Sequence, residues 1–298
     1  MLIPCWNDGA HVEEAVASVH GQGVDVHVVV VDDGSTDPAT LEALTRLREA
    51  GTTVVRQDNA GPAAARNAGL AVADSPFVFA LDADDRLADG ALPLLVAALD
   101  AHPEAAAAWG DTRAFGAYEG VFPNWPELDA WLVTYVNRIP VTALYRTRAL
   151  RDVGGWRLGG YEDWDVWLRL AAAGWRGAHI GRVHLEYRQH TEVRGLRRDT
   201  DRHAELMNQL RRANPEVFAD RHRAARTSGV PLRVRVAFRL LEAVPGVPER
   251  LRHRLYDQTL RQLVPAVRPW YEGTRAPSPL GAVAHRLRGR LTAGRATA

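Results

Sequence analysis

Three carboxylates within four positions form the densest group of chemically capable residues in this 298-residue chain. Asp82, Asp84 and Asp85 directly follow an apolar run that ends at Leu81. Like charges this close repel each other unless a cation neutralises them, and carboxylate oxygens suit Mg²⁺ or Mn²⁺. The pattern therefore indicates a divalent-metal site. A solvated acidic turn, in which Asp85 or Asp89 caps the next helix, is the alternative explanation.

A second acidic pair, Asp32-Asp33, follows four consecutive valines. A run of β-branched residues predicts a buried strand, so these carboxylates stand at its carboxyl end, where they could accept hydrogen bonds from a nucleotide. A tight turn is the alternative, because Asp33-Gly34 is a favourable turn pair. We interpret Asp37, which precedes Pro38, as a helix N-cap.

Two further segments combine small residues with polar ones. The loop 59–62 is small and leads into an alanine-rich segment that carries Arg66 and Asn67, so a nucleotide could approach its backbone closely; a packed helix with Arg66 exposed explains it equally. The glycine-rich segment 154–160 precedes Glu162 and Asp163 at a predicted helix start. A carboxylate there could act as a general base that the helix dipole keeps ionised, although an acidic helix cap is the commoner reason for such residues.

These groups need a scaffold that brings several strand ends together. In the first half, short apolar runs alternate with Ala- and Leu-rich helical segments, which predicts a largely parallel sheet with helices on both faces. The expected strands are residues 2–3, 26–31, 53–56, 77–81 and 105–109. The expected helices are residues 10–20, 38–50, 63–73 and 91–101. Ligands of such sheets bind at the carboxyl ends of the strands, which is where the polar groups fall.

The pattern changes after residue 161. A helix from residue 162, with Trp164, Trp167 and Leu168 on one face, is expected to end at Gly174. Two short strands, 177–183 and 184–188, follow it. Beyond about residue 199 the chain is predicted to be helical, and its last ~25 residues have a composition typical of disorder.

Charge is distributed unevenly along the chain. Residues 1–175 hold 12 Arg and 25 Asp or Glu, whereas residues 176–298 hold 25 Arg and 11 Asp or Glu. Such asymmetry suggests two parts with separate roles. The chain has one cysteine, no apolar stretch of the ~18 residues that span a membrane and no signal-peptide pattern, so we expect a cytoplasmic location.

Taken in order, these motifs resemble family 2 glycosyltransferases with the GT-A fold. The resemblance covers roughly residues 1–190 and rests on Ile3-Pro4-Cys5-Trp6-Asn7, Val30-Val31-Asp32-Asp33-Gly34-Ser35-Thr36-Asp37, Asn59-Ala60-Gly61-Pro62 with Arg66-Asn67, Leu81-Asp82-Ala83-Asp84-Asp85, Gly154-Gly155, Glu162-Asp163-Trp164 and Tyr187-Arg188-Gln189-His190. It implies an α/β fold: a GT-A type nucleotide-binding sheet, mostly parallel, as a catalytic domain over residues 1–198. A helical, Arg-rich C-terminal extension over residues 199–298 would follow it.

The resemblance also implies an activity. The protein would move a sugar from a nucleotide-diphosphate sugar, with UDP the expected nucleotide, to an acceptor hydroxyl with inversion at the anomeric carbon. The expected setting is the synthesis of cell-surface polysaccharide, glycolipid or a related glycan. The expected cofactor is Mg²⁺ or Mn²⁺.

Individual roles follow from the same resemblance. The nucleotide and donor side would be lined by Pro4, Trp6, Asp33, Arg66, Asp82 and Asp111, with Asp33 at the base. The metal would be held by Asp84 and His190, and Trp109 would lie near the donor sugar. Asp163 would be the catalytic base, with Glu162 and Trp164 on the acceptor side, and the segment 154–160 would be the hinge of a closing loop. Trp6 departs from the family's usual Tyr, and the first strand is shorter than usual.

The Arg-rich extension lies outside the resemblance. We expect it to be a helical cap packed on the catalytic domain, because charged faces are often simply solvated. The alternative is a surface for an anionic membrane or a lipid-linked acceptor at the inner face of the plasma membrane, since residues 232–241 mix Arg with apolar residues as an interfacial helix does.

Other classes of protein fit the sequence less well. No G-x-G-x-x-G follows the first strand, which disfavours a dinucleotide oxidoreductase. The acidic first half disfavours nucleic-acid binding, so no nucleic-acid partner is expected. A nucleotidyltransferase would not need Glu162-Asp163-Trp164. The serious alternative is a catalytically inactive sugar-nucleotide-binding protein, although the candidate base and metal ligands are all present.

Overall fold

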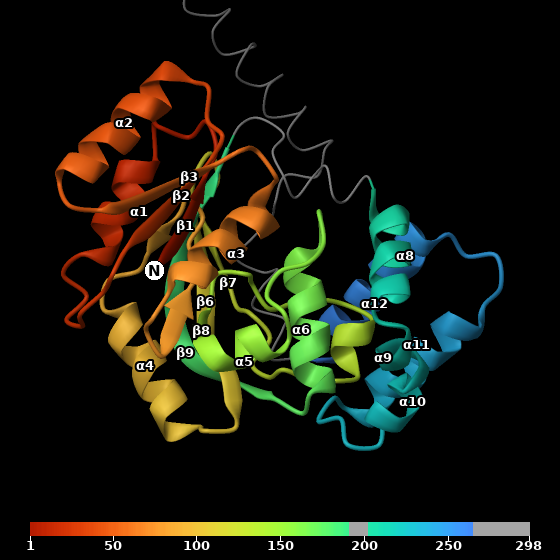
Figure 1. The fold of residues 1–298 in the computed structure, drawn as a ribbon. Helices are drawn as coiled ribbons and strands as arrows, with labels where there is room; N and C mark the ends of the chain where they lie inside the picture. The colour runs from red at the N-terminus through yellow and green to blue at the C-terminus, as the bar shows by residue number, and fades with distance from the viewer. Residues whose placement is uncertain (191–201, 265–298) are drawn as a thin grey trace, which may run out of the picture.

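The structure is a computed structural model that describes residues 1–190 and 202–264. It contains two sheets covered by helices, with a group of helices at one end (Figure 1). The strands are β1 (Leu2–Cys5), β2 (Val29–Asp33), β3 (Thr53–Gln57), β4 (Phe77–Phe79), β5 (Arg86–Leu87), β6 (Ala105–Gly116), β7 (Gly120–Phe122), β8 (Leu144–Arg146) and β9 (Arg176–Gln189).

The helices of the first part are α1 (Val12–Val19), α2 (Pro38–Glu49), α3 (Pro62–Val72), α4 (Ala91–Ala101), α5 (Thr147–Asp152) and α6 (Glu162–Ala172), with a 3₁₀ turn at Leu132–Thr134. Those of the extension are α8 (His203–Ala213), α9 (Pro215–Ala219), α10 (Arg221–Ala224), α11 (Leu232–Ala243) and α12 (Glu249–Leu263). The predicted elements of the first half are all present. Most ends differ by a few residues, but the strand expected at 105–109 continues to Gly116. Within the described ranges, no helix is both long and apolar enough to cross a bilayer.

The first sheet is parallel, in the order β1-β2-β3. Its valine run is buried on both faces. Leu2, Val29 and Val31 pack into the core under α3, whereas Ile3 and Val30 pack into the core shared by α1, α2 and α4. A strand that is covered on both sides needs apolar residues at every position, which explains the unbroken run. Asp37 caps α2, as predicted, by accepting a hydrogen bond from the Thr40 amide at 2.9 Å.

The second sheet has the strand order β4-β8-β6-β9-β5, with β7 paired to β6. Within it β6 and β9 run parallel, whereas the other pairs are antiparallel, so the parallel arrangement expected from the sequence holds for the first sheet and for β6-β9. The two strands expected at 177–183 and 184–188 are one strand, β9. The expected break is instead an irregularity: Gly181 has a φ of 64°, and the register with β6 shifts on either side of Asp111.

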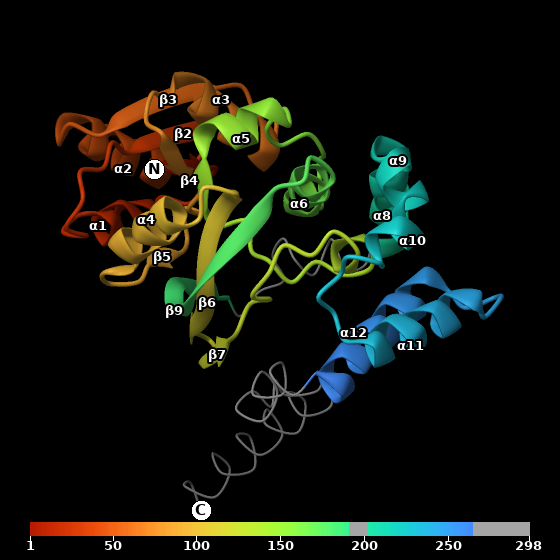
Figure 2. The same cartoon turned by 90° about the horizontal axis from the view of Figure 1, so that it is seen from below.

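Helix α6 lies between the sheets and the extension (Figure 2). Trp164, Trp167 and Leu168 are buried on one face, as predicted. The helix ends in a Schellman motif, because the Gly174 amide donates to Ala171 and the Trp175 amide donates to Leu170. Gly174 has a φ of 84°, so glycine there avoids the strain of a side chain.

The extension shares an aromatic core with the first part. Phe238 of α11 and Tyr256 of α12 pack against Trp131 and Tyr135 at ring-centroid separations of 5.0 to 5.4 Å, and against each other at 4.6 Å. Phe238 is fully buried. These contacts are those of the packing cap that the sequence favoured. The disorder predicted for the last ~25 residues falls outside the described part of the chain.

The shared core makes a prediction about stability. Phe238→Ala should lower the free energy of unfolding by about 3–5 kcal/mol, because it removes a buried ring and leaves a cavity. Leu240→Ala, two residues along and 66% exposed, is the matched control and should change stability by less than about 0.5 kcal/mol. Urea unfolding followed by tryptophan fluorescence measures both. Equal effects would show that α11 is not packed on the core as described.

Candidate active site

Arg66 of α3 links two acids that are far apart in sequence. Its Nη2 donates to Asp82 Oδ1 at 2.6 Å, and its Nη1 donates to Glu162 Oε1 at 2.8 Å. The side chain is 4% exposed, which rules out the alternative of a solvated arginine. Burial alone would lower the pKa of Arg66, but the charges of Asp82 and Glu162 outweigh it and raise the pKa above its ordinary value. The guanidinium therefore stays charged and holds the acidic loop against the start of α6.

Asp163 is the second residue of α6 and lies beside this cluster. Burial raises its pKa to about 7, and the charge of Glu162 adds to the effect. The helix start was expected to favour the ionised form of Asp163, but the cost of desolvating the carboxylate outweighs that help. At neutral pH the group is poised between its two protonation states.

Asn137 is the partner of Asp163 that the sequence did not reveal. Its Nδ2 donates to Asp163 Oδ2 at 2.8 Å, and its Oδ1 accepts from the Ile139 amide at 3.0 Å, which fixes the orientation of the side-chain amide. Asn137 lies in the loop between the 3₁₀ turn and β8, where no motif marks it. Its role depends on tertiary packing alone.

The buried Tyr145 shows that these charged groups share one site. Burial raises the pKa of its hydroxyl well above the usual value, and the charges of Asp163, Asp82 and Glu162 raise it further, while Arg66 opposes them. All four groups are therefore close to one phenol. Its hydroxyl donates to the Val141 carbonyl at 2.9 Å.

The start of α6 has an unusual backbone. Tyr161, the N-cap, is in the left-handed region with a φ of 54°, directly after Gly160. A non-glycine residue in this region costs free energy, and such residues cluster at functional sites. The Tyr161 hydroxyl and His203 Nδ1 of the extension are 2.8 Å apart, so α8 helps to hold this turn.

The glycine-rich segment before α6 is held rather than free. The Asn67 side chain donates to the Trp156 carbonyl at 2.5 Å and accepts from its amide at 3.0 Å. A Cβ on Gly155 would lie 2.3 Å from Asn67 Oδ1, so only glycine fits there. Arg169 Nη2 also donates to the Gly155 carbonyl at 2.6 Å. The residues from 153 to 156 therefore brace α6, and the hinge role expected for the segment 154–160 stays a prediction.

Asp165 is a structural residue. It is fully buried and accepts hydrogen bonds from Arg157, Arg169 and Asn214 at 2.6 to 3.0 Å. Burial would raise its pKa, but hydrogen bonds from Arg157 and Asn214 and the charge of Arg169 outweigh burial and lower it. A carboxylate this fully bonded has no role in taking a proton from a substrate.

The end of β9 brings His190 to the acidic cluster. His190 Nε2 and Asp84 Oδ2 are 2.8 Å apart, so the condition under which His190 becomes a candidate metal ligand is met. Among the described residues no group of three or more His, Cys, Asp or Glu side chains is placed to hold a metal ion. A carboxylate and an imidazole suit Mg²⁺ or Mn²⁺ when phosphate oxygens and water supply the remaining ligands, as they do when these ions bind with nucleotides. The metal itself stays a prediction.

Asp85 differs from its two neighbours. It is buried, and its Oδ1 accepts from the Arg188 amide at 2.8 Å, whereas its Oδ2 has no hydrogen-bond partner within the structure described. Burial, and then the charges of Asp82 and Asp84, raise its pKa well above the usual value. Asp85 is not a helix cap, because Gly90 is the N-cap of α4.

The residues that we expected on the nucleotide side lie mainly at the carboxyl ends of β1 and β2. Trp6 follows β1 and is 58% exposed, which leaves its indole free to stack on a base. Pro4 lies within β1 and is half-buried. The Asp33 carboxylate accepts from Gln57 Nε2 at 2.7 Å and from the amides of Ala60 and Gly61 at 2.9 and 2.8 Å. It shapes the loop before α3, and a role for it at the base stays a prediction.

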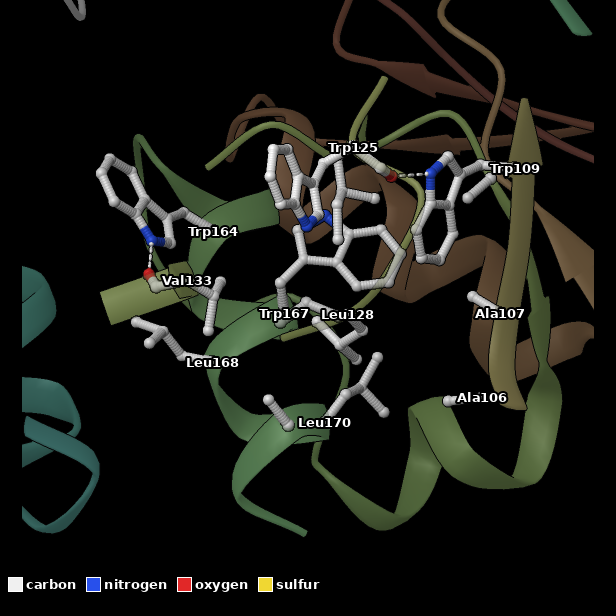
Figure 3. Close-up of a cluster of buried hydrophobic side chains, with 14 of the residues drawn as sticks. Ala106, Ala107, Trp109, Trp125, Leu128, Val133, Trp164, Trp167, Leu168 and Leu170 are labelled. Carbon is white, nitrogen blue, oxygen red and sulfur yellow. Dashed lines mark hydrogen bonds between the residues drawn. The ribbon is translucent and has the colours of Figure 1, made fainter. Parts of the chain in front are cut away.

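Two tryptophans differ from their expected places (Figure 3). Trp109 is fully buried and donates to the Trp125 carbonyl at 2.8 Å, so its side chain does not reach a donor sugar. Trp164 is 3% exposed and donates to the Val133 carbonyl at 2.6 Å, so it supports α6 from within the core and does not face an acceptor. These aromatic rings are buried although they stand next to a motif, because burying their large apolar area stabilises the core.

Asp111 remains partly exposed on β6. Its Oδ1 accepts from the Asn124 amide at 3.1 Å and lies 3.1 Å from His179 Nε2. The side chain is 20% exposed. These bonds place it where β6 and β9 change register, and its proposed donor role stays a prediction.

Solved structures of known proteins share this fold. The structure of TarS residues 1–349 from S. aureus in complex with UDP-GlcNAc gives a TM-score of 0.55 at 20% identity and covers 90% of this chain and 88% of its own. The mannosyltransferase PcManGT from Pyrobaculum calidifontis, in complex with GDP-Man and Mn²⁺, gives a TM-score of 0.54 at 20% identity and covers 97% of this chain and 79% of its own. These likenesses confirm the α/β fold of GT-A type.

Sequence relatives point the same way. The succinoglycan biosynthesis protein ExoU of Rhizobium meliloti is 41% identical over 100 residues, 32% of this chain and 29% of its own length. The chain spans only part of its first curated relatives, matching 20%, 29% and 60% of the lengths of three of them. The profile of the family described as "Glycosyl transferase family 2" matches residues 1–154, which is more than half of the chain. The chain therefore belongs to glycosyltransferase family 2.

Proposed function

We propose that the protein transfers a sugar from a nucleotide-diphosphate sugar to an acceptor hydroxyl, with inversion at the anomeric carbon. One observation carries the proposal. The buried Arg66 joins Asp82, on the donor side, to Glu162, which is the direct neighbour of Asp163. A donor-binding acid and a candidate base thus meet in one site. Membership of family 2 and the UDP-GlcNAc and GDP-Man in related folds support this reading.

Asp163 is suited to take the proton of the acceptor hydroxyl. A general base works best when its pKa is near the working pH, and burial raises the pKa of Asp163 to about 7. Asn137 donates to Oδ2 and so orients the carboxylate that would accept the proton. As the proton moves to Asp163, the acceptor oxygen forms its bond to C1 on the face opposite the diphosphate, and the bond from C1 to the diphosphate breaks. This single displacement inverts C1.

The donor side would be organised by residues of three strand ends. Asp84 and His190 would hold Mg²⁺ or Mn²⁺, which when bound supplies positive charge next to the leaving diphosphate. Trp6 offers an exposed ring to the base, and Arg66 orients Asp82 towards the donor. UDP is our preferred nucleotide, and the PcManGT complex with GDP-Man makes GDP the first competitor to test.

The proposed acceptor is a glycan or a lipid-linked sugar. The match to a succinoglycan biosynthesis protein favours cell-surface polysaccharide or glycolipid synthesis. The basic extension favours work at the inner face of the plasma membrane, where anionic lipids attract arginine. We propose no nucleic-acid partner.

An inactive sugar-nucleotide-binding protein is the second candidate. Such a protein needs the donor side but has no use for a partly buried carboxylate on the acceptor side. The contact of Asn137 with Asp163, which orients a carboxylate whose pKa is near 7, favours the enzyme.

The role of Asp163 makes the first prediction for this site. Asp163→Asn keeps the shape of the side chain but cannot take a proton, so turnover should fall by about 10²–10⁴. The dissociation constant of the donor should change little, because Asp163 is not among the donor-side residues. Turnover and donor binding are measured on one preparation, with Asp100→Asn, exposed on α4, as control. Wild-type turnover in Asp163→Asn would remove Asp163 from the mechanism.

The raised pKa of Asp163 makes a prediction about pH. The base must be ionised in the free enzyme, so kcat/KM should fall as pH drops through about 7 and should level off above it. Asn137→Ala removes a hydrogen bond that favours the charged form, so the inflection should move to higher pH. An unchanged inflection in Asn137→Ala would contradict the contact.

Stability gives an independent check on the same group. A carboxyl whose native pKa lies above its unfolded value favours folding at low pH, and this contribution is lost as pH rises through the native pKa of about 7. Asp163→Asn does not titrate, so its melting temperature relative to wild type should be higher at pH 8 than at pH 5. An equal difference at both pH values would mean that Asp163 titrates normally.

The Asp84–His190 pair makes a prediction about metal. Donor binding should need Mg²⁺ or Mn²⁺, and Asp84→Asn should abolish the part of the thermal shift with UDP-sugar that depends on Mn²⁺. Asp89→Asn, an exposed acid five residues away, is the matched control and should keep it. Full activity in excess chelator would exclude a metal-assisted mechanism.

A further inference from the structure

Helix α11 has two apolar faces, of which the core covers one. Val234 and Phe238 are fully buried against the aromatic core. Leu232, Val236 and Leu240 are 66%, 47% and 66% exposed. Residues four apart lie one above the other on a helix, so these three form a row along its outer side.

Exposed large apolar side chains are concentrated on and next to this helix. Those within residues 232–251 are Leu232, Val236, Leu240, Val244 and Leu251, whereas those elsewhere in the described chain are scattered singly at Trp6, Val72, Leu94 and Val121. Single exposed apolar residues are normal on protein surfaces. A continuous row is different, because contiguous apolar patches mark contact surfaces.

Positive charge surrounds the row. Residues 221–241 contain six Arg and no Asp or Glu. Arg221 pairs with Glu242, but in the described part of the chain Arg223, Arg226 and Arg239, all exposed, form no ion pair with a carboxylate. An open groove of about 560 Å³ lies between α10 and α11, and Leu232, Val236 and these three arginines are among the residues that line it.

We propose that this outer face of α11, the 232–240 row with the arginines beside it, docks on an anionic lipid bilayer. Its leucines and valine would enter the interface between headgroups and acyl chains, and the guanidinium groups would contact lipid phosphates. An apolar row flanked by arginines that form no ion pair with a carboxylate in the described chain matches a bilayer, whose interior is apolar and whose anionic headgroups are negative. The helix lies in the interface and does not span it.

Charge argues against the other occupants. Two copies joined through this face would set arginines against arginines. Residues 265–298 of this chain contain six Arg and one Glu, so their charge also opposes a position over the groove. A nucleic acid would contact the arginines through its phosphates but would leave the apolar row exposed, because its backbone binds mainly positive charge.

The position of α11 fits the proposed reaction. α11 and α12 lie side by side, and α6 lies between the first sheet and the helices of the extension to which they belong (Figure 2). Docking there would bring the end of the molecule that carries Asp163 towards the bilayer, where a lipid-linked acceptor is found. Only this use rests on the proposed function, because vesicle binding itself needs no sugar transfer.

The test is co-sedimentation of the full chain with vesicles of phosphatidylcholine alone or with added phosphatidylglycerol. We expect binding to the anionic vesicles only, and binding should weaken sharply as salt rises. Leu240→Gln and Leu232→Gln should each reduce the partition coefficient about 10-fold, and Arg239→Gln about 5-fold. Leu94→Gln on α4 and Arg48→Gln on α2, both exposed, are the matched controls and should bind as wild type.

Three results would overturn the proposal. The first is equal recovery with neutral and anionic vesicles, and the second is wild-type binding by both Leu232→Gln and Leu240→Gln. The third is a wild-type dimer in light scattering that Leu240→Gln converts to monomer without any effect on vesicle binding. Sugar transfer to a soluble acceptor is measured separately. If the wild-type protein binds vesicles but transfers no sugar, the proposed activity is contradicted and the docking face is not.

Discussion

One buried cation holds the site together. Arg66 carries its charge in a place with almost no solvent, and two acids from distant segments, Asp82 and Glu162, offset the cost of burying it. Removing either acid would leave a buried charge partly unpaired, which typically destabilises a protein by about 3–5 kcal/mol. The acidic loop after β4 and the first turn of α6 are therefore fixed relative to each other. Because Asp163 follows Glu162 directly, the same ion pairs also set the distance between the donor side and the candidate base.

A second set of buried polar contacts keeps α6 in place. Asp165, in the same first turn of α6, binds Arg157, Arg169 and Asn214, and so ties the helix both to the segment before it and to the extension. Asn67 fixes the glycine-rich segment from the side of α3. Catalysis by a general base depends on its position to within a fraction of an ångström. These networks give Asp163 a rigid support, and the pKa of about 7 comes from the same burial.

The C-terminal extension has one face that packs on the core and another that is exposed. Its inner face completes the aromatic core around Phe238. His203, the first residue of α8, contacts the Tyr161 hydroxyl and so helps to hold the strained backbone of Tyr161. Its outer face is apolar and basic. The packing cap and the membrane surface, which the sequence presents as alternatives, are therefore compatible: on α11 the two roles use residues on opposite sides of one helix.

The sequence by itself determined the α/β pattern and the family, because strand runs, the Asp37 cap and the order of the motifs are local features that survive any change in packing detail. It also predicted that Asp84, His190, Asp163 and Arg66 are functional residues, and the structure brings Asp84 to His190, and Arg66 to the turn of Asp163. Only the tertiary structure decided protonation and exposure. Burial, which no local pattern reports, raises the pKa of Asp163. Folding also brings Asn137 into hydrogen-bond contact with Asp163. It places Trp109 and Trp164 in the core rather than at a substrate. These properties depend on which distant segments exclude water from a side chain, and that is decided when the whole chain has folded.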